Sequence, residues 1–169
     1  MTARMQAPRT TPTSLKILTV VVALAYAASG ISPYDRTTWL LESTPVLVLM
    51  PILWWTRASF PLTPLLYAGI GVQLVGLLVG AAYTFPRVPL GEWLREAFDL
   101  SRNPYDRLGH VVQGIVPALA ARELLVRRTP MREGALLAFL TACIVMTFSA
   151  SYELVEGLVA ITIGTIAFF

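Results

Sequence analysis

Charged residues are scarce in this sequence. Asp, Glu, Lys and Arg make up 14% of the 169 residues, whereas apolar residues make up 56%. A typical soluble domain carries roughly 25% charged residues, which cover its surface with groups that face water. The composition therefore excludes an ordinary soluble globular protein and predicts that most of the surface faces lipid.

Several features that would identify a chemistry are also missing. Cys143 is the single cysteine, so a disulfide within the chain is impossible, and its apolar surroundings favour a buried, inert thiol. The sequence has no nucleotide-binding glycine loop, no two-histidine zinc helix and no nucleophile elbow. It also lacks the repeated broken helices of many secondary transporters. No motif assigns a reaction to this chain.

The basic residues do not indicate a nucleic-acid partner. The net charge is +3, but the 13 Lys and Arg residues are spread along the chain and many flank apolar runs. Lys and Arg gather on the cytoplasmic side of membrane proteins. A cytoplasmic N-terminus places the larger set inside, namely Arg4, Arg9, Lys16, Arg57, Arg122, Arg127, Arg128 and Arg132. It places the smaller set outside, namely Arg36, Arg87, Arg95, Arg102 and Arg107.

Five apolar runs are candidates for membrane-spanning helices, each of which needs about 20 mostly apolar residues. They cover residues 15–31, 38–55, 65–85, 105–126 and 134–169. The last run fits two short spans broken near residues 149–156, or one span that ends near Glu153 with an apolar tail. We favour the single span. The first run resembles a signal peptide, but the runs that follow favour an uncleaved anchor.

We therefore predict an all-α, polytopic bundle of about five spans in a bacterial inner membrane. A single transmembrane domain covers residues 15–169 and follows a cytoplasmic tail over residues 1–14. Pro45 and Pro51 predict a kink in the second span. Its tryptophans are expected to anchor it at the membrane interfaces, namely Trp39, Trp54 and Trp55.

Residues 90–100 predict a short amphipathic helix on the membrane surface. The apolar residues recur at helical spacing, namely Leu90, Trp93, Leu94, Ala97 and Phe98. The charged residues between them form a solvated face, namely Glu92, Arg95, Glu96 and Asp99.

Three glycines of the third run lie on one face of the expected helix, namely Gly69, Gly76 and Gly80. Small residues at this spacing allow close approach of a second helix. We favour packing within the monomer over self-association of two copies, which stays the alternative.

The fourth run is the most polar. Asp106, His110 and Gln113 recur at steps of four and three and so share one stripe of a helix. Ionisable groups at membrane depth cost several kcal/mol by most estimates and are usually retained for pairing or for function. His110 is the only histidine in the chain. Its imidazole can accept a proton or, with Asp106, bind a metal.

Glu153 and Glu156 share a face of the last run. If the fourth and fifth helices pack, these carboxylates converge with Asp106 and His110 near the outer surface. The candidate polar cluster is Asp106, His110, Gln113, Glu153 and Glu156. Its metal-binding subset, for a divalent ion, is Asp106, His110 and Glu153.

The same polar residues can also have purely structural roles. The Asp106–His110 pair can simply stabilise its helix, and Glu123 beside Arg122 can lie at the inner interface with its charge in water. Glu42 is more consistent with an interfacial position than with a functional one.

Five stretches resemble the YjdF-like bacterial inner-membrane proteins, a family of unknown function. They are residues 31–42 (ISPYDRTTWLLE), 61–67 (PLTPLLY), 82–94 (AYTFPRVPLGEWL), 100–125 (LSRNPYDRLGHVVQGIVPALAARELL) and 149–156 (SASYELVE). The family's polar positions are matched by Asp106, Arg107, His110, Gln113, Glu153 and Glu156. A more distant resemblance is to VanZ-like proteins, which share an Asp–His helix followed by a Glu-bearing helix and are associated with glycopeptide resistance.

The resemblance implies a compact helical membrane protein, usually with six spans. Relatives continue after the Glu-bearing stretch with an acidic loop and a final span, and they tend to carry tryptophan at the position of Gly157. We expect this chain to be truncated or diverged there. If the family's site uses the later aspartates, this copy lacks them and is inactive.

Three functions remain open at this stage. The favoured one is a membrane protein that binds or handles envelope lipids or amphiphiles, with membrane lipids as its partners. The alternatives are a metal-dependent or acid–base membrane enzyme acting on a lipid-linked substrate, and a small proton-coupled transporter.

Overall fold

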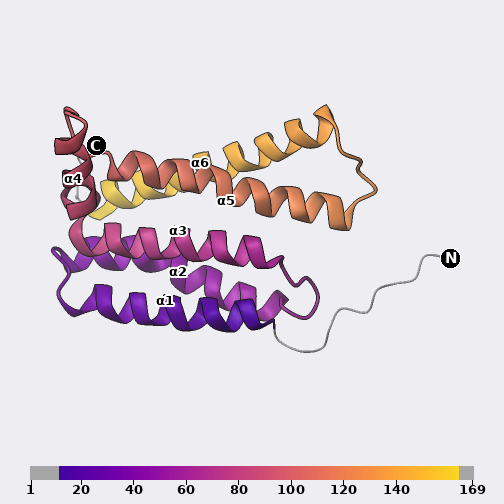
Figure 1. Cartoon of the computed structure of the whole chain (residues 1–169), viewed down its shortest axis with the longest axis horizontal. Coiled ribbons are helices and arrows are strands. Elements are labelled where there is room, and N and C mark those ends of the chain that lie inside the picture. The colour runs from indigo at the N-terminus through magenta and orange to yellow at the C-terminus, as the bar shows by residue number, and fades with distance from the viewer. Residues whose placement is uncertain (1–11, 164–169) are drawn as a thin grey trace. The chain divides into compact units, whose positions relative to one another are not determined.

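The computed structural model describes residues 12–163, and the regular elements in that range are all helices (Figure 1). They are α1 (Thr13–Ile31), α2 (Arg36–Thr56), α3 (Pro64–Tyr83), the 3-10 turn η1 (Phe85–Arg87), α4 (Pro89–Ala97), α5 (Tyr105–Arg128) and α6 (Ala135–Ile163). The predicted all-α class is confirmed. The chain forms two compact units, one ending at Val112 and one beginning at Gln113, so the boundary falls within α5.

Four helical segments are long and apolar enough to cross a membrane: α1, α2, α3 and the Ala135–Val155 part of α6. The expected fifth span, α5, is long enough at 24 residues but carries charges at both ends. Its uncharged middle, residues 108–121, rises only about 21 Å against a hydrocarbon core of about 30 Å. To span, α5 would have to extend its terminal arginines toward the headgroups. A fifth span stays a prediction.

α6 is one continuous helix through the described residues. No break occurs near residues 149–156, so the single-span interpretation is confirmed over the two-span one. The helix continues past Glu153 to Ile163, where the apolar tail was expected. Residues 164–169 lie outside the described range.

Local sequence explains where the second and third helices begin. The Asp35 carboxylate accepts a hydrogen bond from the Thr38 backbone N–H at 2.7 Å and so caps the first turn of α2. This contact lowers the pKa of Asp35 from its ordinary value of 3.8. Thr63 caps α3 in the same way, directly before a proline at the first helical position. α2 runs through Pro45 and Pro51 without a break.

α1, α2 and α3 form the core of the first unit (Figure 1). The most buried side chains of α3 are Leu66, Tyr67, Leu74, Leu78 and Ala81. α1 contributes Leu15, Leu18 and Val22, and α2 contributes Val46 and Leu53. Each of these rows follows a helical period, which is why an apolar sequence still selects one inward face.

Two tryptophans of α2 fasten it to α1. The Trp39 indole Nε1–H donates to Ser29 Oγ at 3.0 Å, and the Trp54 Nε1–H donates to Thr19 Oγ1 at 2.9 Å. These indoles were predicted to be interfacial anchors, and they also bond the two helices. Trp55 is 84% exposed and points away from that contact.

Two glycines of α3 receive neighbours from the same chain. A Cβ at Gly80 would lie 2.5 Å from Cε1 of Phe85, so any larger residue must displace the Phe85 ring. The Gly76 carbonyl accepts a hydrogen bond of 2.9 Å from the Tyr105 hydroxyl at the start of α5. This is the packing within the monomer that the sequence favoured. Self-association of two copies stays a prediction.

The predicted amphipathic helix is α4, and the loop after it holds it in place. The Asn103 side-chain amide donates to the Val88 carbonyl at 3.1 Å and to Glu92 Oε1 at 3.2 Å, and its oxygen accepts from the Tyr105 N–H at 3.0 Å. Gly91 gives Asn103 room, because a Cβ there would lie 1.8 Å from Asn103 Oδ1.

The apolar side chains of α4 remain outward. Leu90, Trp93 and Phe98 are each more than half exposed. Glu92 is held by Arg95 Nε at 2.7 Å and by Asn103, and these bonds lower the pKa of the Glu92 carboxyl. The Glu92 carboxylate in turn raises the pKa of Arg95. The charged face therefore forms an ordered network.

Candidate functional site

Asp106 and His110 form a pair on α5. His110 Nε2 lies 3.7 Å from Asp106 Oδ1, and both side chains are about half exposed, at 52% and 49%. The spacing of four residues had predicted this shared stripe. The distance exceeds that of a normal hydrogen bond, so the contact is chiefly electrostatic and requires a protonated imidazole to be an ion pair. Asp106 also lies in the first turn of α5, where a negative charge stabilises the helix N-terminus.

The predicted convergence with α6 is a separate matter. Asp106 and His110 belong to the first unit, and Glu153, whose side chain is exposed, belongs to the second. The backbone of Glu156 is helical, but its side chain lies outside the described residues, and Gln113 opens the second unit. Among the residues that the structure describes, no three His, Cys, Asp or Glu side chains are grouped to hold a metal ion. The metal site and the five-residue cluster stay predictions.

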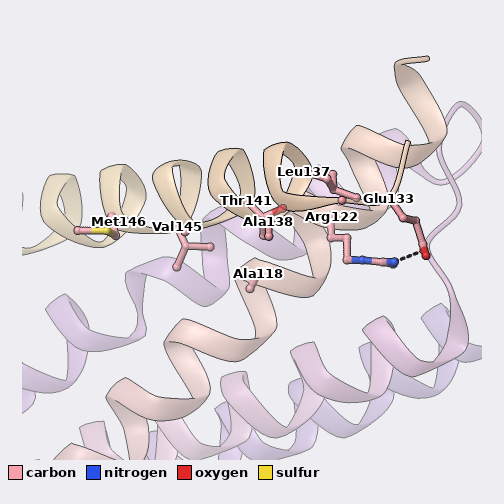
Figure 2. Close-up of a pocket in the computed structure, with 10 residues that line it drawn as sticks. Ala118, Arg122, Glu133, Leu137, Ala138, Thr141, Val145 and Met146 are labelled. Atoms are coloured by element: carbon pink, nitrogen blue, oxygen red, sulfur yellow. Dashed lines mark hydrogen bonds and ion pairs between the residues drawn. The ribbon is translucent and has the colours of Figure 1, made fainter. Parts of the chain in front are cut away.

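The second unit contains a cavity between α5 and α6 (Figure 2). Its volume is about 540 Å³, and it is open on one side rather than enclosed. Its lining comprises Ala118, Arg122, Glu133, Gly134, Leu137, Ala138, Thr141, Ala142, Val145 and Met146. Most of these side chains are apolar, and the volume falls within the range of about 300–1,000 Å³ that is usual for ligand pockets.

An ion pair stands at one end of the cavity. The Arg122 guanidinium reaches from α5 to Glu133, which lies in the loop before α6 (Figure 2). The adjacent Glu123 pairs instead with Arg127, one turn further along α5. The sequence grouped Arg122 with Glu123 as interfacial neighbours, whereas the structure gives each a different partner. The φ of Gly134 is 154°, a conformation that favours glycine.

The Thr141 side chain is part of the cavity lining. Among the side chains that the structure describes, Thr141 Oγ1 is the buried oxygen that has no hydrogen-bond partner. Other helical hydroxyls donate to the carbonyl four residues earlier, as Thr19 does to Leu15 and Thr147 does to Cys143. An unsatisfied buried hydroxyl costs about 1–3 kcal/mol. Thr141 is therefore a polar group that a bound molecule could satisfy.

Sequence reasoning missed this cavity, although a signal for it was present. Ala138, Thr141, Ala142 and Val145 recur at steps of three, one and three along α6, so small residues fill one of its faces. Small side chains on facing helices permit either close contact or an open space. The pattern alone does not decide between them.

The comparisons with known proteins agree with the helical membrane architecture. The family model described as "Predicted membrane protein (DUF2238)" matches residues 14–168. The chain is 47% identical over 147 residues to the inner membrane protein YjdF of Escherichia coli (strain K12), covering 87% of this chain and 69% of that protein. No solved structure matches it.

Neither description names a reaction or a ligand, and the more distant VanZ-like resemblance stays a prediction. The YjdF-like resemblance is confirmed, since the family match covers nearly the whole chain. Together with four apolar helices, these matches show an integral membrane protein of unknown function. The chain belongs to the DUF2238 family of membrane proteins.

Proposed function

We propose that this protein is a multi-pass inner-membrane protein that binds a lipid-like amphiphile in the α5–α6 cavity. The observation that carries the proposal is the cavity itself, which combines an apolar lining with an ion pair at one end. An amphiphile has the same division into an apolar chain and a polar head. The cavity is open rather than enclosed and α6 is one of the apolar candidate spans, so we expect such a molecule to enter from lipid.

The helices that form the cavity leave apolar surface to be covered. Within the Ala135–Val155 part of α6, 6% of the most apolar window is buried, against 39% for α3. Burial of apolar surface is favourable at roughly 25 cal/mol per Å². In a bilayer that surface is covered by acyl chains, and a chain that fits the cavity gains dispersion contacts on several sides.

The test uses the full chain in a neutral detergent and lysophosphatidylcholine, a zwitterionic amphiphile with one acyl chain. Native mass spectrometry measures how much of it remains bound. Ala142→Phe fills the cavity and is expected to reduce the bound fraction severalfold. Ala150→Phe adds the same bulk on α6 outside the cavity lining and is expected to leave binding unchanged. Equal binding by all three proteins would remove the basis for the proposal.

The orientation is part of the same proposal. A cytoplasmic N-terminus, with α5 crossing the membrane, places α4 outside and the loop of residues 129–134 inside. The excess of basic residues on that inner side supports it. Alkaline phosphatase, which is active only outside the inner membrane, is expected to be active when fused after residue 100 and inactive after residue 131. The reverse pattern would contradict this orientation.

A further inference from the structure

We infer that the α5–α6 cavity selects an anionic, glycerol-linked lipid, with its head at Arg122 and its linkage region at Thr141. This inference rests on the proposed function and names the class of amphiphile. It follows from three observations: the net positive charge of residues 122–133, the solvent exposure of the Arg122–Glu133 ion pair, and the unpaired hydroxyl of Thr141 in the cavity lining.

The segment that leads from the cavity-lining part of α5 to the start of α6 is basic. Residues 122–133 contain four arginines and two glutamates and no other charged residue. Arg122 is the member of this group whose guanidinium lines the cavity from α5. Basic segments at a membrane surface attract anionic lipids, at about 1 kcal/mol per Lys or Arg. A zwitterionic head gains no such net attraction.

The Arg122 guanidinium can exchange the Glu133 carboxylate for another anion. The Arg122 and Glu133 side chains are 50% and 79% exposed, and exposed ion pairs contribute little to stability. Glu133 lies in the loop and not on a helix, so a small backbone movement withdraws it. A phosphate offers the planar guanidinium the same bidentate contact as a carboxylate and carries the charge of the lipid. Glu133 therefore occupies the place that the headgroup takes.

Thr141 provides a second polar group in the cavity lining. It lies six residues after Ala135, the first residue of α6, which corresponds to roughly 9 Å along that helix. Its hydroxyl is the described oxygen left without a partner. A ligand that satisfies it must carry a hydrogen-bonding group between its charged head and its apolar chain. The ester and hydroxyl groups of a glycerol linkage lie there, whereas a fatty acid has no second polar group.

The decisive experiment compares two lysolipids of equal chain length on the full protein in neutral detergent. Lysophosphatidylglycerol is anionic, and lysophosphatidylcholine is zwitterionic. We expect the anionic lipid to bind about three- to tenfold more tightly, the effect of one basic side chain beside an anionic headgroup. Arg122→Gln should abolish this preference, because it weakens lysophosphatidylglycerol binding more than lysophosphatidylcholine binding. Arg132→Gln removes the same charge from the loop that follows α5, outside the cavity lining, and should retain the preference.

Two further variants keep the test informative. Glu133→Gln removes the competing carboxylate and should tighten lysophosphatidylglycerol binding, which tests the exchange even if Arg122→Gln fails to fold. Thr141→Val should weaken both lysolipids equally, since both carry the glycerol linkage.

The outcomes separate the two proposals. If both lysolipids bind equally to the wild type, and Ala142→Phe still blocks them, the amphiphile site stands and anionic selection is wrong. If Arg122→Gln and Arg132→Gln reduce the preference equally, a diffuse basic patch accounts for it and the Arg122 site is wrong. If inorganic phosphate displaces lysophosphatidylglycerol at equal affinity, the site is one for phosphate and not for lipid. If neither lysolipid binds, both proposals fail.

Discussion

Replacement of Gly91 by alanine should detach α4 from the loop that holds it. The added Cβ would lie 1.8 Å from Asn103 Oδ1, so the Asn103 side chain must leave its position. Its departure breaks three hydrogen bonds, to Val88, Glu92 and Tyr105. At about 0.5–1.5 kcal/mol each, these bonds are worth about 1.5–4.5 kcal/mol.

The higher helix propensity of alanine offsets part of this loss of hydrogen bonds. Alanine is a better helix former than glycine by about 0.8–1 kcal/mol in a helix interior. The net destabilisation of the α4 region is therefore about 0.5–3.5 kcal/mol, because the lost hydrogen bonds outweigh the gain in helix propensity. Gly109→Ala is the matched control, because its Cβ would meet Phe85 at an ordinary 3.9 Å. We expect this control to be neutral or slightly stabilising.

Limited trypsin digestion in detergent measures the effect locally, since Arg95 and Arg102 flank the end of α4. Cleavage there should accelerate by between about twofold and several hundredfold in Gly91→Ala, which is the ratio that about 0.5–3.5 kcal/mol of local opening gives. In an Asn103→Ala background, Gly91→Ala should have almost no further effect, because the clash and the three bonds are already gone. Equal cleavage of Gly91→Ala and the wild type, or additive effects of the two substitutions, would refute the reasoning.

Three further predictions concern the same unit. Folding lowers the pKa of Glu92 from its ordinary value of 4.5, so the ionised Glu92 stabilises α4 above pH 4.5. This stabilisation is lost as the pH falls from 4.5 through the pKa of the folded protein. Trp93 fluorescence should show this acid transition in the wild type and not in Glu92→Gln. Tyr105→Phe removes the hydrogen bond to the Gly76 carbonyl and should destabilise the first unit by about 0.5–1.5 kcal/mol in thermal unfolding, whereas an unchanged midpoint would mean that this bond does not hold the start of α5. Gly80→Ala places a Cβ 2.5 Å from the Phe85 ring and should lower the free energy of unfolding by about 1–3 kcal/mol. Combining it with Phe85→Ala should recover part of that loss. A double variant destabilised by more than the sum of the two single changes would contradict the clash.

The helices could be predicted from the sequence because each depends on local information. Runs of apolar residues set the positions of α1, α2, α3 and α6, and the alternation of apolar and charged residues identified α4. The Asp106–His110 contact was predictable for the same reason, since residues four apart on a helix are neighbours. The sequence also showed that α5 is the most polar of the long helices. Because α5 carries charges at both ends, its crossing of the membrane stays a prediction.

The α5–α6 cavity could not be predicted, since it depends on how far two helices stand apart. Arg122 pairs with Glu133 and not with its sequence neighbour Glu123. Thr141 Oγ1 makes no hydrogen bond, whereas Thr19 and Thr147 donate to the carbonyl four residues earlier. Both choices are made by side-chain conformations with small energy differences. The predicted convergence of Glu153 with His110 stays a prediction, because it would require contacts between residues far apart in sequence, which no helical period encodes.

The tryptophan bonds between α1 and α2 have a consequence for the order of assembly. All four partners lie within the first 54 residues, at Thr19, Ser29, Trp39 and Trp54. The two bonds join opposite ends of the hairpin, so together they fix how far one helix can slide along the other. We expect this register to be set as soon as α2 has been synthesised and inserted. α3 would then dock on a finished two-helix surface, and loss of either bond would be felt first as slow or mistaken insertion of the segments that follow.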